Sequence, residues 1–244
     1  MKLGLALLFT LTFAIIGCRR ASESARGTGA TEDYVVLTEE QAKIYITPTI
    51  YNISVHNGTN AECPVSDLRD VKSPKGIVLA KVCASFLKKC ILQGSCKVLV
   101  GDSFQLLHYS EKVNGEFRFS KVDESICRYS YGVHGVCVDP FYSVAADLSI
   151  YESGTVVFIP AAVGIILPDG AIHDGHFIVR DSGSKILGYG RFDFFTGYNQ
   201  LDQATNPLVK LGLAWKGTHL PYYLITGDKA REVLNSRYYP SIPD

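Results

Sequence analysis

The chain has 244 residues, and its 24 basic side chains are balanced by 24 acidic ones. This length allows one large domain or two small ones. A balanced charge argues against a nucleic-acid partner, because such partners usually call for a basic face.

Residues 1–18 are typical of an export signal rather than of folded structure. Lys2 supplies the positive start, and residues 3–16 form an apolar run that is too short to span a bilayer comfortably. The run ends in Ile-Ile-Gly-Cys, which resembles a bacterial lipoprotein processing site, so Cys18 is predicted to carry a lipid after cleavage. The alternative is an ordinary secretory signal that is cut near Cys18.

Residues 19–33 are rich in small, polar and charged side chains and predict a flexible tether. Arg19 is not an acidic retention signal, so we expect the protein in the periplasm, lipid-anchored to the outer membrane, or secreted to the cell envelope. No other stretch is long and apolar enough to span a bilayer, so the N-terminal lipid is the only membrane contact that we expect.

Ordered structure is expected from residue 34 onward. Residues 43–54 predict a strand or a strand pair, with Pro48 marking a bend or an edge. Residues 77–92 carry apolar side chains at helical spacing and are followed by Gly94, so they predict a helix and its end. Asn114-Gly115, flanked by alternating residues, predicts a hairpin.

The cysteines that remain after Cys18 all lie within residues 63–137. Their even number in an exported chain favours disulfides, although many pairings exist and the sequence does not choose among them. No Cys-x-x-Cys pair is present, so we expect neither a metal nor another cofactor. The segment at about residues 56–137 therefore predicts a disulfide-containing α+β insertion in a larger β domain. Its disulfide candidates are Cys63, Cys83, Cys90, Cys96, Cys127 and Cys137.

The second half of the chain contains short apolar runs that predict strands, at residues 144–147, 155–160, 176–181 and 191–195. Turns with glycine separate these runs and no long helix lies between them, so the expected class is all-β, a barrel or a sandwich. Residues 206–244 are weakly patterned and form a C-terminal extension, with a short helix expected at residues 228–234.

Three of these runs are ended or interrupted by an aspartate: Asp147, Asp181 and Asp193. A carboxylate in a buried strand costs several kcal/mol unless it is hydrogen-bonded, paired or left partly in water. Three such residues, separated by glycine-rich turns, therefore predict a shared site.

Strand alternation places Asp193 on a groove-lining face. Phe192 and Phe194 are expected to fill the core, while Arg191, Asp193 and Phe195 point the other way. Phe195 would raise the pKa of the Asp193 carboxyl and Arg191 would lower it, so the net direction stays open.

Several short motifs follow one another in this half of the chain: Ala146-Asp147, Ser153-Gly154-Thr155, Arg180-Asp181-Ser182-Gly183 and Arg191-Phe192-Asp193-Phe194-Phe195-Thr196-Gly197. Their order resembles the three-Asp (3D) domain family, which includes membrane-bound lytic transglycosylase A. The match covers about residues 142–197, and Thr49-Ile50-Tyr51 resembles the family's first strand. The resemblance implies a six-stranded double-psi β-barrel over residues 34–205, interrupted by the Cys-rich insertion, with a glycan-binding groove.

By position, Asp193 matches the family's proposed catalytic acid, and Asp181 and Asp147 match its two companions. The resemblance implies a lytic transglycosylase that cleaves peptidoglycan strands between N-acetylmuramic acid and N-acetylglucosamine and leaves 1,6-anhydro ends. The turn that begins at Asp181 reads Asp-Ser-Gly-Ser-Lys where the family usually has Asp-Thr-Gly-Gly-Ala, and one extra residue separates Asp181 from Asp193. The substrate-binding residues expected beside these carboxylates are Thr49, Tyr51, Arg191 and Phe195.

Two other functions stay open. A hydrolase on the same barrel would use Asp181 or Asp174 as the base for water, with two carboxyl groups roughly 6.5–9.5 Å apart. A non-catalytic glycan-binding module would use the aspartates only to hydrogen-bond sugars.

Residues 169–176 form a second cluster, in which histidines and aspartates share a glycine-rich loop. The loop could be a turn that lines the groove, a participant in substrate binding or proton transfer, or a metal site. Such a loop does not fix both rings toward one point, so a metal is disfavoured, and His173 and Asp174 are the expected substrate-binding residues. The other histidines have no partner visible in the sequence and are expected to be structural: His56, His108, His134 and His219.

Overall fold

The structure is a computed structural model that describes residues 37–57, 63–198, 204–237 and residue 240. The predicted signal peptide, the lipidated Cys18 and the tether lie outside these residues. The described residues all belong to one compact unit. In its described part, no helix is long and apolar enough to cross a membrane.

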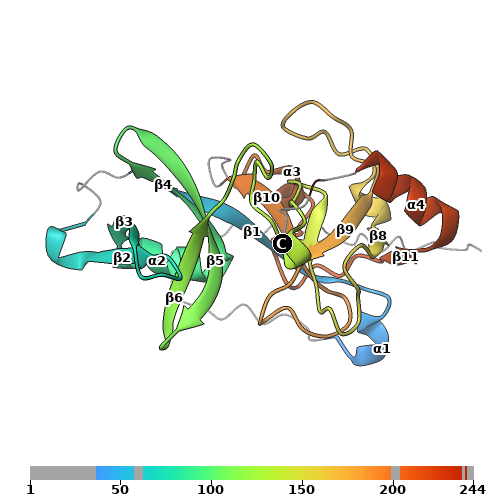
Figure 1. Ribbon diagram of the computed structural model, residues 1–244. Coiled ribbons are helices and arrows are strands. Elements are labelled where there is room, and N and C mark those ends of the chain that lie inside the picture. The colour runs from blue at the N-terminus through green and yellow to red at the C-terminus, as the bar shows by residue number, and fades with distance from the viewer. Residues whose placement is uncertain (1–36, 58–62, 199–203, 238–239, 241–244) are drawn as a thin grey trace, which may run out of the picture. The chain divides into compact units, whose positions relative to one another are not determined.

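The described residues contain one sheet of 11 strands, in the order β11-β8-β9-β7-β10-β1-β4-β5-β6-β2-β3 (Figure 1). The predominance of β structure is confirmed. The order is open, and the closure of six strands into a double-psi barrel remains a prediction. The strands are β1 (Thr47–His56), β2 (Leu68–Lys72), β3 (Val78–Cys83), β4 (Ser95–Val100), β5 (Ser103–Val113), β6 (Glu116–Lys121), β7 (Ser143–Ala145), β8 (Val156–Phe158), β9 (His176–Asp181), β10 (Arg191–Tyr198) and β11 (Tyr223–Ile225). The helices are α1 (Glu39–Ala42), α2 (Ala84–Gln93), α3 (Pro207–Lys210) and α4 (Gly227–Ser236).

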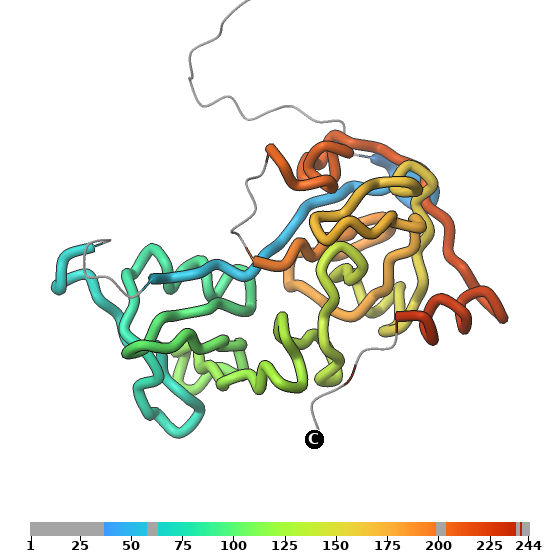
Figure 2. The backbone as a smooth tube through the Cα atoms, turned by 90° about the horizontal axis from the view of Figure 1, so that it is seen from above, coloured from blue at the N-terminus to red at the C-terminus, as the bar shows by residue number. Residues whose placement is uncertain are grey.

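Strand β1 runs between the two halves of the sheet, as its course in Figure 2 shows. Its first part pairs in parallel with β10, and residues 54–56 pair in parallel with β4. Pro48 lies in the first part, where β10 is the one hydrogen-bonded neighbour among the described strands. A proline has no N–H to donate, so this edge position suits it and agrees with the sequence prediction.

Separate apolar clusters occupy the two faces of β10. Phe192 and Phe194 lie in the cluster that also holds Phe177 of β9. Phe195 lies in another cluster, together with Ile53 of β1. Consecutive side chains of a strand point to opposite faces, so the predicted alternation of this strand is confirmed. A third cluster packs α2 against β2 to β6.

The expected helix over residues 77–92 is wrong in its first half. Val78–Cys83 form β3, and α2 begins only after them. Ala80 and Val82 are buried while Lys81 between them is exposed, which is the alternation of a strand, and this strand pairs with β2. Gly94 ends the helix in the left-handed conformation (φ 74°), as predicted.

The other predicted elements are present with shifted ends. The Asn114-Gly115 turn joins β5 to β6, and both residues have positive φ angles of 51° and 81°, as two-residue hairpins require. The aspartate-bearing runs form β7, β9 and β10, and the run between the first two forms β8. The short C-terminal helix is α4.

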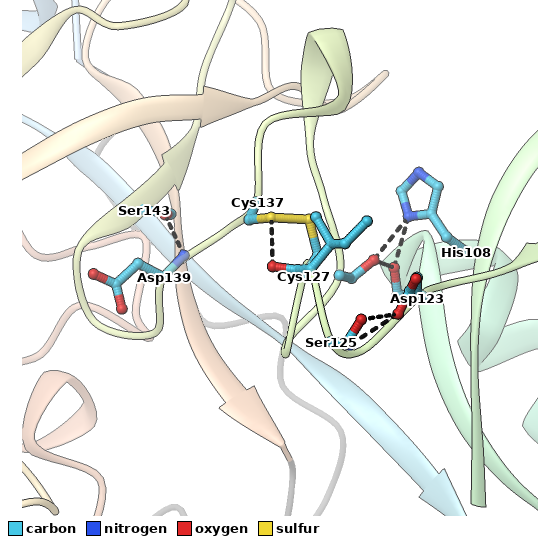
Figure 3. The surroundings of a disulfide bond; sticks show 10 residues. His108, Asp123, Ser125, Cys127, Cys137, Asp139 and Ser143 are labelled. Carbon is cyan, nitrogen blue, oxygen red and sulfur yellow. Dashed lines mark hydrogen bonds between the residues drawn. A yellow bond between two sulfur atoms is a disulfide. The ribbon is translucent and has the colours of Figure 1, made fainter. Parts of the chain in front are cut away.

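All of the disulfide candidates are paired. The bonds are Cys63–Cys83, Cys90–Cys96 and Cys127–Cys137. The second bond ties α2 to β4. The third closes residues 127–137, the end of the Cys-rich segment before β7 (Figure 3).

Candidate active site

Four neighbouring strands bring two of the aspartates into one row across the sheet. Asp193 of β10 lies opposite Thr49 of β1 on one side and opposite Ala145 of β7 on the other. Ala145 in turn lies opposite Asp181 of β9. Paired residues direct their side chains to the same face, so both carboxylates share one face of the sheet. Two strand spacings put their Cα atoms about 10 Å apart, with the small side chain of Ala145 between them.

Asp193 is held by a directed chain of hydrogen bonds. The Thr49 hydroxyl donates to Asp193 Oδ1 at 2.5 Å, and Arg191 Nη2 donates to the Thr49 hydroxyl oxygen at 2.9 Å. Arg191 is itself fixed by a hydrogen bond of 3.0 Å to the Thr47 carbonyl. No described residue donates to Asp193 Oδ2, and the side chain is partly exposed. One carboxyl oxygen of Asp193 is therefore positioned by Thr49, and the side chain retains some exposed surface.

The pKa of Asp193 is raised above its ordinary value. Burial is the main cause, because it disfavours the charged carboxylate. The Thr49 hydrogen bond and the charges of Arg191 and Lys216 oppose the rise without cancelling it. The sequence left the direction of this pKa shift open, and the structure shows that the shift is upward. A raised pKa favours a carboxyl that retains its proton and can donate it.

Asp181 uses both of its carboxyl oxygens. The Tyr51 hydroxyl donates to Oδ2 at 3.0 Å, and the Ser182 backbone N–H donates to Oδ1 at 2.8 Å. Burial raises the pKa of Asp181 to about 6, with a further rise from the charge of Asp193, against the effect of the two hydrogen bonds. Burial also raises the pKa of Tyr51 well above its ordinary value, so this phenol remains a neutral donor. Tyr51 thereby links β1 to β9 across the face that carries Asp193.

Asp181 should make stability fall with rising pH. Its pKa of about 6 in the folded protein exceeds the roughly 3.9 of an unfolded chain, so the folded state binds the proton more tightly. The contribution of Asp181 to the free energy of unfolding should be highest below about pH 4 and decline, by at most about 3 kcal/mol, as pH rises to about 6. Urea unfolding between pH 4 and 8 measures this slope, and Asp181→Asn should flatten it. An equal slope in both proteins would contradict the assignment.

Asp147 lies in a different setting, two residues beyond Ala145. Its Oδ1 accepts from both the backbone N–H and the hydroxyl of Ser149, at 3.0 and 2.6 Å. Its Oδ2 accepts from the Gly188 N–H at 2.8 Å. The Ser149 and Gly188 hydrogen bonds lower the pKa of Asp147. These contacts close the turn after β7 and tie it to the loop before β10, which favours a strand-holding role.

Comparison with known proteins identifies the domain that contains these aspartates. The 3D domain family model matches residues 142–206, which include all three aspartates. This chain contains a 3D domain. Among curated proteins, none matches it in sequence.

The fold around the 3D domain is similar to that of MltA. In the crystal structure of Escherichia coli MltA with bound chitohexaose, the likeness covers 74% of this chain and 71% of that chain, at 14% sequence identity and a TM-score of 0.52. Membrane-bound lytic murein transglycosylase from Agrobacterium tumefaciens is 13% identical, over 80% of this chain and 76% of that chain, with a TM-score of 0.47.

The histidine loop of the 3D domain is a buried turn at His173. The side chain of His173 is 0% exposed. Its Nε2–H donates to the Phe141 carbonyl at 2.9 Å, and the Gly175 N–H donates to its Nδ1 at 2.8 Å, which fixes a neutral ring. Burial also lowers the pKa of His173. His173 was expected to contact a substrate, but its side chain has no exposed surface with which to do so. The interpretation of residues 169–176 as a turn is therefore favoured.

The other expected substrate-binding residues divide into exposed and buried ones. Asp174 is exposed, accepts from the His176 backbone N–H at 3.0 Å, and lies 3.3 Å from the His176 ring nitrogen Nδ1. Thr49, Tyr51 and Arg191 surround the aspartate row as described above. Phe195 is 1% exposed, and its ring centroid lies 5.0 Å from that of Tyr51. It therefore packs against Tyr51 and has no exposed surface for contact with a sugar.

Sequence reasoning missed Lys216 and Tyr198. Lys216 belongs to the C-terminal extension, yet its charge lowers the pKa of Asp193. Tyr198 ends β10 and packs against Tyr129 of the Cys-rich segment at a ring distance of 5.5 Å. No local pattern in the sequence distinguishes these residues, because each depends on contacts between distant segments.

Proposed function

We propose that this chain is a peptidoglycan lytic transglycosylase with Asp193 as its acid and base. The observation that carries the proposal is the setting of Asp193 in a 3D domain: the Thr49 hydroxyl donates to one carboxyl oxygen, the side chain is partly exposed, and the pKa of the carboxyl is raised. An MltA with a similar fold was crystallised with chitohexaose, which supports a β-linked glycan as the ligand.

The mechanism needs one carboxyl group. Protonated Asp193 gives its proton to the oxygen that links N-acetylmuramic acid to N-acetylglucosamine, and the bond from that oxygen to the muramic acid C1 breaks. The Asp193 carboxylate then takes the proton of the muramic acid C6 hydroxyl, whose oxygen bonds to C1. The product is a 1,6-anhydro end, and Asp193 regains its proton. An intramolecular nucleophile has a high effective concentration, so no second carboxylate is needed to activate water.

The neighbours of Asp193 orient the reaction in this proposal. Thr49, which is oriented by Arg191, donates to Asp193 Oδ1, so the transferable proton resides on Oδ2. Tyr51 and Asp181 form a hydrogen-bonded pair beside the acid, placed to contact sugar hydroxyls. Asp147 holds the turn that carries the end of β7.

A hydrolase is the second candidate, because Asp181 lies on the same face as Asp193 and its pKa of about 6 would suit a base. Against this role, both oxygens of Asp181 already accept hydrogen bonds. A glycan-binding module without catalysis is the third.

Mass spectrometry of purified peptidoglycan after incubation with the protein distinguishes these functions. The transglycosylase should release muropeptides with 1,6-anhydro ends. Reducing ends would instead identify the hydrolase, and undigested glycan that retains the protein would identify the binding module.

The proposal also covers the cellular location of the protein and the closure of its 3D domain into a barrel. We propose that the chain is exported, lipid-anchored through Cys18 in the periplasm, and that its 3D domain closes as a double-psi barrel. Metabolic labelling with a fatty acid tests the anchor, since Cys18→Ala should abolish incorporation. Label on the Cys18→Ala protein would refute it.

A further inference from the structure

A bulge in β10 turns Tyr198 onto the face that carries Asp193. Tyr51 pairs with Phe195, but Ile53 pairs with Tyr198, so β10 holds one more residue than β1 over this stretch. Gly197 adopts φ 78° within the extra segment, as bulges with a left-handed residue require. The register then places Tyr198 beside Ile53, on the same face as Tyr51 and Phe195.

A cavity of about 400 Å³ opens on this face, further along β1 and β10 than Thr49 and Asp193. Lys97 pairs with Val55 in the register of β1 and β4, so the strands direct both side chains to the face of Tyr198. Cavities of this size hold small ligands or ligand substituents. Its lining residues are Val55, Lys97, Phe104, Arg128, Tyr129 and Tyr198.

The cavity carries excess positive charge. Lys97 is neutralised by Glu124, whose carboxylate lies 2.6 Å from its ammonium group. Arg128 is exposed, stacks over Tyr129 at 5.2 Å, and forms no ion pair with any described residue. Arg128 is therefore a cation at the rim of an aromatic cavity, which suits a planar carboxylate.

The segment that carries Arg128 and Tyr129 is fixed before any ligand arrives. The Cys127–Cys137 disulfide closes it on one side (Figure 3). On the other side, the Ser130 hydroxyl lies 2.8 Å from the Ser95 hydroxyl and 3.1 Å from His108 Nδ1. The Tyr198 hydroxyl also donates to the Arg128 carbonyl at 3.0 Å. An arginine on a fixed backbone loses little conformational entropy on binding, so Arg128 can contribute to selectivity among ligands.

We propose that this cavity binds a carboxylate borne by the glycan, so that the protein selects muramic acid strands over uncharged ones. The inference rests on the proposed function. Four residues of β1 separate the level of Asp193 from that of Tyr198, a distance of about 13 Å along the strands. A strand bound at Asp193 can therefore present a neighbouring substituent to Arg128. The carboxylate can belong to the lactyl group of muramic acid or to the peptide attached to it.

Binding by the full chain with Asp193→Asn tests the proposal without turnover. Isothermal titration should compare three ligands: a neutral hexamer of β-1,4-linked N-acetylglucosamine, a peptide-free peptidoglycan strand, and a strand with its peptides. Adding Arg128→Gln should weaken binding of a carboxylate-bearing strand about tenfold or more. The neutral hexamer should bind both proteins equally. Arg231→Gln, an exposed change on α4, is the matched control and should alter none of the three affinities.

The pattern of losses identifies the carboxylate. A loss only with the peptide-free strand assigns the cavity to the lactyl carboxylate, because the peptide-bearing strand holds that group as an amide. A loss only with the peptide-bearing strand assigns the cavity to a carboxylate of the peptide, and a loss with both strands shows that the cavity accepts either carboxylate. Equal affinities with and without Arg128 for every ligand would overturn the proposal. Anhydro-product release by the wild type is measured in parallel. Selective binding without release of anhydro products would support the carboxylate-binding cavity and refute the proposed transglycosylase. Release of anhydro products with unselective binding would support the transglycosylase and refute the carboxylate-binding cavity.

Discussion

Replacing Asp193 by Asn is expected to reduce muropeptide release by roughly 10²–10⁴-fold, the usual contribution of a general acid. The amide cannot donate an acidic proton or recover one from the C6 hydroxyl. Its oxygen can still accept the Thr49 hydroxyl, so the chain of hydrogen bonds from Arg191 is retained. Chromatography of soluble products from purified peptidoglycan measures the loss, and circular dichroism checks the fold.

Asp102→Asn is the matched control, because Asp102 is exposed in the turn between β4 and β5. It removes the same charge and should leave muropeptide release unchanged. A folded Asp193→Asn protein that releases anhydro products at the wild-type rate would remove Asp193 as the acid and direct attention to Asp181.

Local patterns in the sequence predicted the strands that carry the site. Alternation of apolar residues in residues 191–195 placed Phe192 and Phe194 in the core and Asp193 on the opposite face, and the clusters confirm this. Glycine-rich turns marked where β8, β9 and β10 are separated. These features depend on neighbouring residues, so one sequence is enough to infer them.

Contacts between distant segments could not be predicted in the same way. The Thr49–Asp193 hydrogen bond joins residues 144 positions apart, and it follows from the parallel register of β1 and β10. The disulfide pairing likewise follows from the fold rather than from the spacing of the cysteines. Phe195 was expected to line the groove, but packing of the Cys-rich segment over this face buries it.

The error in residues 77–92 has a physical cause. Apolar residues at positions 78, 82, 86 and 90 fit a helical period, and Val78 and Val82 also fit the alternation of a strand. Pairing with β2 and the Cys63–Cys83 disulfide fix the first half as a strand. Tertiary contacts therefore decide between two patterns that the local sequence satisfies equally.

Gly132→Ala should cause a large loss of stability. A Cβ atom at Gly132 would overlap the carbonyl oxygen of Arg180 and approach the Asp181 Cα to 3.1 Å. Both neighbours are backbone atoms, so no side-chain rotation relieves the overlap. The segment cannot withdraw, because the Cys127–Cys137 disulfide holds it. We expect a loss of about 3 kcal/mol, measured by urea unfolding.

The same substitution should slow catalysis, because β9 must shift where it carries Asp181. A displacement of about 1 Å near a reacting group can cost on the order of 10²-fold in rate. Gly101→Ala is the control: φ there is 61° and nothing lies within 4 Å, so it adds backbone strain alone and should leave activity intact. If Gly132→Ala proved as stable and as active as Gly101→Ala, the close packing of the Cys-rich segment on β9 would be refuted. Equal activity with reduced stability would instead show that Asp181 tolerates displacement, which would weaken its assigned place beside the acid.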